Sequence, residues 1–176
     1  YYLMKLKKFS YKKVISTNST ALRLIKIGKS SGFITSEFQF KGRGQRGNKW
    51  ISKHGNIFIS VFFSINKKIS IKDLTKKNLN IVKNIIKKYV NKKIEIKHPN
   101  DILIEKSKVC GILQETIFRD ELKYLIIGVG INLENTPHIP NYPTTYLNKY
   151  SKKKINKLRI INDLKLNFEK NMKNYR

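Results

Sequence analysis

The stretch from Gly42 to Trp50, GRGQRGNKW, contains the residue types that most clearly suggest chemistry. Its glycines let the backbone approach a ligand closely, and Arg43 and Arg46 supply planar donors that suit phosphate or carboxylate. The stretch fits neither the P-loop nor the dinucleotide-binding pattern. The alternative is a flexible basic surface loop, but Trp50 indicates a loop that folds over a partner with an apolar face. We therefore predict a loop that surrounds an anion.

Three further stretches combine small residues with polar ones. KHPND at 97–101 places a neutral and an anionic group, Asn100 and Asp101, immediately before a strand, although such a pair taken alone is more often a turn cap. KVCGIL at 108–113 and GVGIN at 128–132 carry glycines in apolar runs, where the backbone can approach a ligand. Together these stretches predict a site at the ends of neighbouring strands.

The elements that must position these residues follow from hydrophobic periodicity and capping residues. Ser70 followed by Asp73 marks the start of the longest helix, and Asn162 is the expected N-cap of the last one. We expect helices at 19–27, 71–90 and 162–174, and strands at 14–16, 33–38, 56–63, 94–97, 102–104, 109–118 and 122–129. The sum is an α+β domain, with a mixed, largely antiparallel sheet and helices packed against it.

The composition is that of a globular protein with an unusual charge. Lys and Arg number 38 and Asp and Glu number 11, which gives a formal net charge of +27. Such a balance is typical of nucleic-acid-binding proteins. The lysines, however, are scattered along the chain and Ala21 is the only alanine, so we favour a genomic base-composition bias over selected binding. With either cause, the charge attracts anionic ligands and acidic partner proteins.

Cysteine content and hydropathy indicate the compartment. The single cysteine, Cys110, cannot form an internal disulfide, which agrees with a reducing interior. Lys5, Lys7 and Lys8 interrupt the N-terminal apolar residues, so no signal peptide is predicted. No apolar run approaches the roughly 18 residues of a membrane span. We therefore expect a cytoplasmic protein that binds no membrane.

Five motifs occur together in the order and approximate spacing of the catalytic domain of biotin protein ligases. They are Ser16-Thr17-Asn18 followed by Gln39, and then GRGQRGNKW, KHPND, KVCGIL and GVGIN. The chain resembles this family from about residue 16 to residue 147. The resemblance implies a fold like that of class II aminoacyl-tRNA synthetases. It also implies an enzyme that converts biotin and ATP to biotinyl-5'-AMP and pyrophosphate, and then transfers biotin to a specific lysine of a biotin carboxyl carrier protein.

The resemblance assigns residues to both ligands. Biotin presents a neutral ureido ring that needs donors and acceptors together. The implied biotin-binding residues are Ser16, Thr17, Asn18, Gln39, Arg43, Gly44, Gln45, Lys108 and Gly111. The implied nucleotide-binding residues are Arg46, Asn48, Trp50, Lys97, Asn100 and Asn132.

Three residues are implied to be catalytic. The biotin carboxylate must attack the α-phosphate of ATP, and Lys108 and Arg43 would screen the repulsion between these two anions. Asp101 would help to deprotonate the acceptor lysine. Mg²⁺ is expected to arrive with ATP, and no metal bound directly by the protein is predicted. The implied partner is the carrier domain of acetyl-CoA carboxylase or a related carboxylase, with a homodimer as a further possibility and no specific nucleic acid.

Two other functions compete with this interpretation. A lipoate protein ligase shares the fold and the adenylate chemistry, but its loop normally carries a longer run of glycines than this chain has. A basic nucleic-acid-binding domain is favoured only by the net charge, and the clustered arginines and aromatics that would support it are not found in the sequence.

The chain departs from the family pattern at several positions. Gln45 and Asn48 stand where many members have arginine, which would weaken retention of the adenylate. His98 replaces a common tryptophan and is interpreted as a packing residue rather than a base, and Cys110 as a small buried side chain. We expect one catalytic domain over 1–176, without an N-terminal winged helix or a C-terminal SH3-like barrel.

Overall fold

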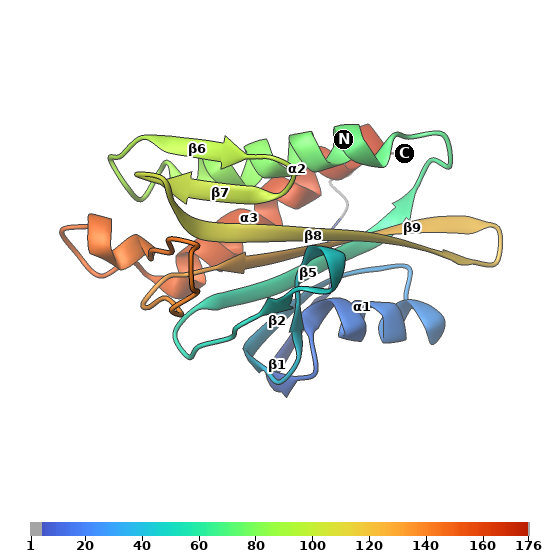
Figure 1. The fold of residues 1–176 in the computed structure, drawn as a ribbon. Helices are drawn as coiled ribbons and strands as arrows, with labels where there is room; N and C mark the ends of the chain where they lie inside the picture. The colour runs from blue at the N-terminus through green and yellow to red at the C-terminus, as the bar shows by residue number, and fades with distance from the viewer. Residues whose placement is uncertain (1–4, 176) are drawn as a thin grey trace.

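The computed structural model describes residues 5–175, which form one seven-stranded sheet, a small two-stranded sheet and packed helices (Figure 1). The seven strands are β1 (Lys8–Val14), β2 (Ser31–Gln39), β5 (Ile57–Ile65), β6 (Ile94–Lys97), β7 (Asp101–Ile104), β8 (Ser107–Arg119) and β9 (Leu122–Ile131). Their order in the sheet is β1-β2-β5-β9-β8-β7-β6. Only β1 and β2 pair in parallel among these neighbours. The predicted α+β fold with a mixed, largely antiparallel sheet is confirmed.

Helices cover both faces of this sheet. Helix α1 (Thr17–Lys26) packs on one face, and α2 (Ile71–Ile86) and α3 (Lys157–Asn171) pack on the other (Figure 1). The larger core lies under α2 and α3, and the smaller core lies under α1. Three short 3-10 helices complete the described structure: η1 (Gln45–Gly47), η2 (Leu147–Tyr150) and η3 (Met172–Tyr175).

Strand β5 shows why the sheet is buried on both faces. Its sequence, IFISVFFSI, is apolar at nearly every position, and such a run is typical of a central strand. Phe62 packs in the smaller core under α1, and Ile59 and Phe63 point into the larger core. The alternation of the strand places Phe58 on the same face as Phe62. Ser60 interrupts the apolar row on the α1 face, although its side chain is fully buried. A polar partner must therefore reach it from α1.

The glycine-rich stretch is an ordered hairpin rather than a flexible loop. Strands β3 (Gly42–Arg43) and β4 (Lys49–Trp50) form the two-stranded sheet, and η1 makes the turn between them. Arg46 and Gly47 adopt φ values of 55° and 78°, a left-handed conformation that glycine tolerates best. The backbone therefore brings Arg43 and Trp50 to adjacent strands.

Several predicted boundaries are wrong for local reasons. The first strand spans Lys8–Val14 rather than 14–16, because a half-exposed edge strand with scattered lysines lacks a clear apolar pattern. Helix α1 begins earlier than residue 19, since the Ser16 hydroxyl caps it by accepting from the Ser19 N–H at 3.0 Å. Helix α2 has the predicted N-cap, Ser70, but ends at Ile86.

The last helix also begins earlier than predicted. Asn156 rather than Asn162 is its N-cap and accepts from the Arg159 N–H at 3.2 Å. The first turns of α3 then carry Ile160 and Ile161 into the core. None of the helices described between residues 5 and 175 is long and apolar enough to span a bilayer.

The orientation of α3 can be tested with two substitutions on the same helix. Phe168→Ala should lower the free energy of unfolding by about 3 to 5 kcal/mol, because it removes a fully buried ring from the larger core. Leu166→Ala is the matched control and should change it by no more than about 0.5 kcal/mol, since Leu166 is exposed. Urea denaturation measures both, and equal losses would contradict the packing of α3.

Candidate functional site

A cavity of about 190 Å³ opens on the α1 face of the sheet. Residues far apart in the sequence line it, from the start of α1, the β3–β4 hairpin, the turn before β7, and strands β8 and β9. All but two of the predicted site residues contribute to its wall. Those that do are Ser16, Thr17, Asn18, Gln39, Arg43, Gly44, Gln45, Arg46, Asn48, Trp50, Asn100, Asp101, Lys108 and Gly111.

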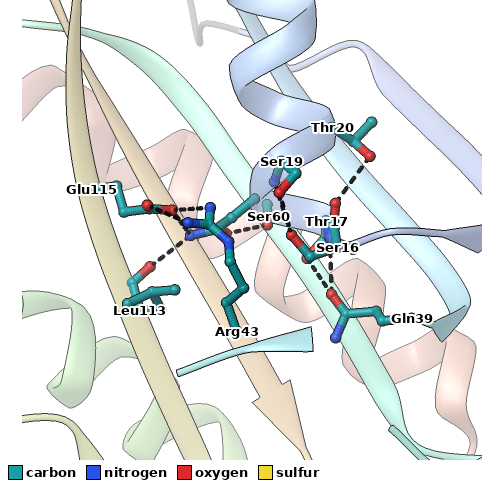
Figure 2. Close-up of polar contacts among 10 residues, drawn as sticks. Ser16, Thr17, Ser19, Thr20, Gln39, Arg43, Ser60, Leu113 and Glu115 are labelled. Carbon is teal, nitrogen blue, oxygen red and sulfur yellow. Dashed lines mark hydrogen bonds and ion pairs between the residues drawn. The ribbon is translucent and has the colours of Figure 1, made fainter. Parts of the chain in front are cut away.

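The start of α1 presents a prearranged set of polar groups to the cavity (Figure 2). The Thr17 N–H and hydroxyl both donate to Gln39 Oε1, at 2.8 and 3.2 Å. The Gln39 amide nitrogen donates in turn to the Ser52 hydroxyl at 3.2 Å. Thr17 and Gln39 are buried, so these bonds fix the direction of both side chains, while the buried Ser16 hydroxyl is held by Ser19.

Asn18 connects α1 to three strands of the sheet. Its amide nitrogen donates to Leu113 O at 3.2 Å and to Glu115 Oε2 at 2.8 Å. Its amide oxygen accepts from the buried Ser60 hydroxyl at 2.6 Å, which supplies the partner that β5 requires. A Cβ at Gly128 of β9 would collide with this same oxygen, so glycine is needed there.

Two paired glycines form the floor of the cavity. Gly111 of β8 and Gly130 of β9 lie directly opposite each other in the sheet. A Cβ would stand 2.8 Å from the Trp50 ring at Gly111 and 2.5 Å from it at Gly130. The indole therefore rests on bare backbone, and any larger residue would displace it. Its Nε1 is buried and has no hydrogen-bond partner among residues 5–175.

Lys108 and Asp101 form a largely buried ion pair beside this floor. The Lys108 Nζ lies 2.9 Å from Asp101 Oδ1, and the two side chains are 19% and 13% exposed. The ammonium is close enough to Oδ1 to form an ion pair, but its direction does not suit a hydrogen bond to that oxygen. Asp101 Oδ1 accepts no hydrogen bond within the described chain. Lys108 Nζ also lies 5.4 Å from the centre of the Trp50 ring.

Tyr142 contacts the other carboxylate oxygen of Asp101. Its hydroxyl donates to Asp101 Oδ2 at 2.7 Å. Burial raises the pKa of Tyr142, and the hydrogen bond and the negative charge of Asp101 raise it further, so the hydroxyl remains a donor at neutral pH. No motif marks this residue, because Tyr142 lies in a loop 41 positions from its partner.

Arg43 is held by Glu115 of β8. Its Nη1 and Nη2 donate to the two carboxylate oxygens at 2.9 and 2.7 Å, a bidentate pair visible in Figure 2. The Arg43 side chain is 39% exposed and that of Glu115 is 26% exposed. Both cations that the sequence predicts as catalytic are thus paired with carboxylates.

Lys97 and Asn132 do not line the cavity. Lys97 is exposed, with its Nζ 4.3 Å from the centre of the Tyr142 ring. Asn132 is buried and donates to Thr145 O at 3.1 Å, so it ties the end of β9 to the following loop. Their roles with nucleotide stay predictions.

Other residues line the cavity without having been predicted for the site. They are Lys49, Pro99, Ile112, Leu113, Gly128, Val129 and Gly130. The alternation of β8 offers a signal for Leu113, since it follows Gly111 on the same face of the strand. His98 is exposed rather than packed, and Cys110 is fully buried. Within residues 5–175, no three His, Cys, Asp or Glu side chains gather closely enough to hold a metal ion.

Comparison with known proteins identifies the family. The model of the Biotin/lipoate A/B protein ligase family matches residues 11–132, which include all five motifs. The chain belongs to this family. The resemblance to biotin protein ligases that the motifs predict is thereby confirmed.

Individual members of the family show how far the similarity extends. The bifunctional ligase/repressor BirA of Escherichia coli is 32% identical over 67% of the chain and 38% of its own length. The Bacillus subtilis BirA is 30% identical over 91% of the chain and 52% of its own length. The chain thus spans about half, or less, of these relatives. The biotin protein ligase of Aquifex aeolicus, solved in complex with biotin and ATP, is 26% identical with a TM-score of 0.79, over 95% of the chain and 70% of that protein.

The contact of Tyr142 with Asp101 predicts a measurable effect on stability. Tyr142→Phe should lower the free energy of unfolding by about 1 to 3 kcal/mol, because a charged acceptor loses its donor. Tyr146→Phe is the matched control, since the structure gives the Tyr146 hydroxyl no hydrogen bond within residues 5–175. Chemical denaturation compares the two variants, and indistinguishable stabilities would contradict the hydrogen bond.

Proposed function

We propose that the chain activates biotin with ATP to biotinyl-5'-AMP and pyrophosphate, and then transfers biotin to a lysine of a biotin carboxyl carrier protein. One observation carries this proposal: the five family motifs converge on a single cavity that combines a polar pocket, an apolar floor and a buried cation. The Aquifex aeolicus ligase, which has the same fold and is 26% identical, was solved with biotin and ATP.

The two ends of the cavity suit the two parts of biotin. The hydroxyl and amide groups of Ser16, Thr17 and Gln39 offer donors and acceptors to the ureido ring. The apolar side chains that line the same cavity, among them Trp50, Pro99 and Leu113, suit the apolar body of the bicycle. The polar groups are already held by one another, so little ordering is needed when biotin binds.

The chemical step requires cations between two anions. The biotin carboxylate oxygen attacks the α-phosphorus of ATP, a new O–P bond forms, and the bond to pyrophosphate breaks with its electrons leaving on pyrophosphate. Lys108 lies at the cavity wall, where its ammonium can stabilise the negative charge that develops on the α-phosphate. Arg43, from the hairpin that covers the cavity, adds a second positive charge. Mg²⁺ bound to the triphosphate would add further charge neutralisation.

The transfer step requires a base near the adenylate. The acceptor lysine must lose a proton before its amine can attack the mixed anhydride, which releases AMP and forms an amide bond. Asp101 Oδ1 accepts no hydrogen bond within the described chain, while Tyr142 holds Oδ2. When Lys108 turns to the adenylate, Oδ1 becomes free to accept the proton. The first step thereby prepares the base for the second.

The acceptor is the carrier domain of acetyl-CoA carboxylase or a related biotin-dependent carboxylase. A relative from Paracoccus denitrificans is named a biotin ligase for acetyl-CoA carboxylase, which supports this choice. The net charge of +27 favours an acidic partner surface and raises its association rate. Pyrophosphate exchange into ATP tests the activation step, with biotin in one arm and lipoate in the other. Exchange with lipoate alone would overturn the proposal.

Removal of either cation should cripple activation. Lys108→Ala and Arg43→Ala should each slow biotin-dependent pyrophosphate exchange by about 100-fold, because less charge then opposes the repulsion between carboxylate and phosphate. Lys92→Ala is the matched control, since Lys92 pairs with Glu105 outside the cavity lining. A wild-type rate of pyrophosphate exchange in Lys108→Ala or Arg43→Ala would show that the substituted residue takes no part in the reaction.

Substitution of the base should separate the two steps. Asp101→Asn should slow the transfer of biotin from isolated adenylate to a carrier domain by about 100-fold, because the amide cannot accept the lysine proton. Pyrophosphate exchange should fall much less. Single-turnover transfer with purified biotinyl-5'-AMP measures the first effect. Equal losses in both assays would show that Asp101 positions Lys108 instead.

A further inference from the structure

Glu115 occupies a central place in the site: it does not line the cavity described above, but it lines an adjoining hollow under the same hairpin. It follows Gly111 and Leu113 on the same face of β8, just beyond the cavity wall. Its carboxylate accepts from both Arg43 Nη atoms and from Asn18 Nδ2, at distances between 2.7 and 2.9 Å. One side chain thus joins the hairpin, the start of α1 and the central sheet (Figure 2).

The hairpin transmits this contact to the cavity floor. Arg43 pairs with Lys49 across β3 and β4, and the neighbouring pair is Gly42 with Trp50. The hairpin is closed by the Gly44 N–H, which donates to Asn48 O at 2.7 Å. Anchoring Arg43 to β8 therefore restrains the strand pair that carries the Trp50 indole onto the two floor glycines.

We propose that Glu115 is a positioning residue that holds the glycine-rich hairpin closed over the cavity and orients Asn18 within it. Glu115 acts through Arg43 and Asn18 and does not touch the ligand. The Arg43 guanidinium stays paired with Glu115 when biotin binds. Its positive charge therefore keeps a fixed position relative to the cavity. The ligand in this proposal, biotin, rests on the proposed function, but the clamp itself is a property of the empty protein.

Acrylamide quenching of tryptophan fluorescence tests the clamp without any ligand. Trp50 is the only tryptophan in the chain, so its signal reports the hairpin alone. Glu115→Gln keeps the size of the side chain but removes its charge, and quenching of Trp50 should increase. Glu121→Gln is the matched control, because Glu121 pairs with Lys67 on the surface and is 97% exposed. Its quenching should equal that of the wild type.

Salt distinguishes an ionic clamp from a merely structural role. The Arg43–Glu115 pair is partly exposed, so raising the salt concentration to about 1 M should weaken it and increase quenching in the wild type. The Glu115→Gln variant should respond much less, since it has already lost the pair. A wild-type signal that is independent of salt would overturn the proposal even if the variant failed to fold.

Biotin titrations followed by Trp50 fluorescence complete the test. Glu115→Gln should bind biotin about tenfold more weakly, which corresponds to a loss of about 1.4 kcal/mol of binding free energy. Unchanged quenching and affinity would overturn the clamp. Tighter binding would also overturn it, because Glu115 would then compete with the ligand for Arg43. If the wild type binds no biotin while quenching still depends on Glu115, the clamp is supported and the proposed function fails.

Discussion

The approach of the Trp50 indole to the paired backbones of Gly111 and Gly130 is the contact on which the rest of the site depends. Only two facing glycines leave room for the ring, and they lie on adjacent central strands that the core holds from the other side. The ring brings the β3–β4 hairpin over the sheet, and the hairpin brings Arg43 within reach of Glu115. The cavity is the space that this arrangement leaves between the hairpin, the start of α1 and the sheet.

The two cations that are predicted to be catalytic are each balanced by a carboxylate, although the chain is strongly basic. Lys108 is paired with Asp101, and Arg43 is paired with Glu115. The net charge of +27 draws anions towards the protein, but it does not distinguish one anion from another. Selection must come from the buried polar groups, because an unsuitable ligand would leave them desolvated and unpaired. The fixed network around Gln39 therefore matters more for specificity than the lysine-rich surface does.

Much of this arrangement could be predicted from the sequence, and the remainder depends on long-range pairs. The apolar runs of β5 and β9 indicated strands, and the predicted site residues account for about two thirds of those that line the cavity. Glu115 and Tyr142 could not be found in this way, since each acquires its role from a partner at least 41 positions away. The cap of α3 was misplaced because Asn156 and Asn162 are equally suitable residue types, and only packing of Ile160 and Ile161 selects the earlier one.

We propose that one cavity both activates biotin and delivers it to a protein. The most direct test of this proposal is the intact mass of a biotin carboxyl carrier domain after incubation with the purified chain, ATP, Mg²⁺ and biotin. We predict a carrier domain heavier by one biotinyl group, attached to a single lysine and formed only when ATP is present. An unmodified carrier domain, with the chain folded as judged by circular dichroism, would contradict it.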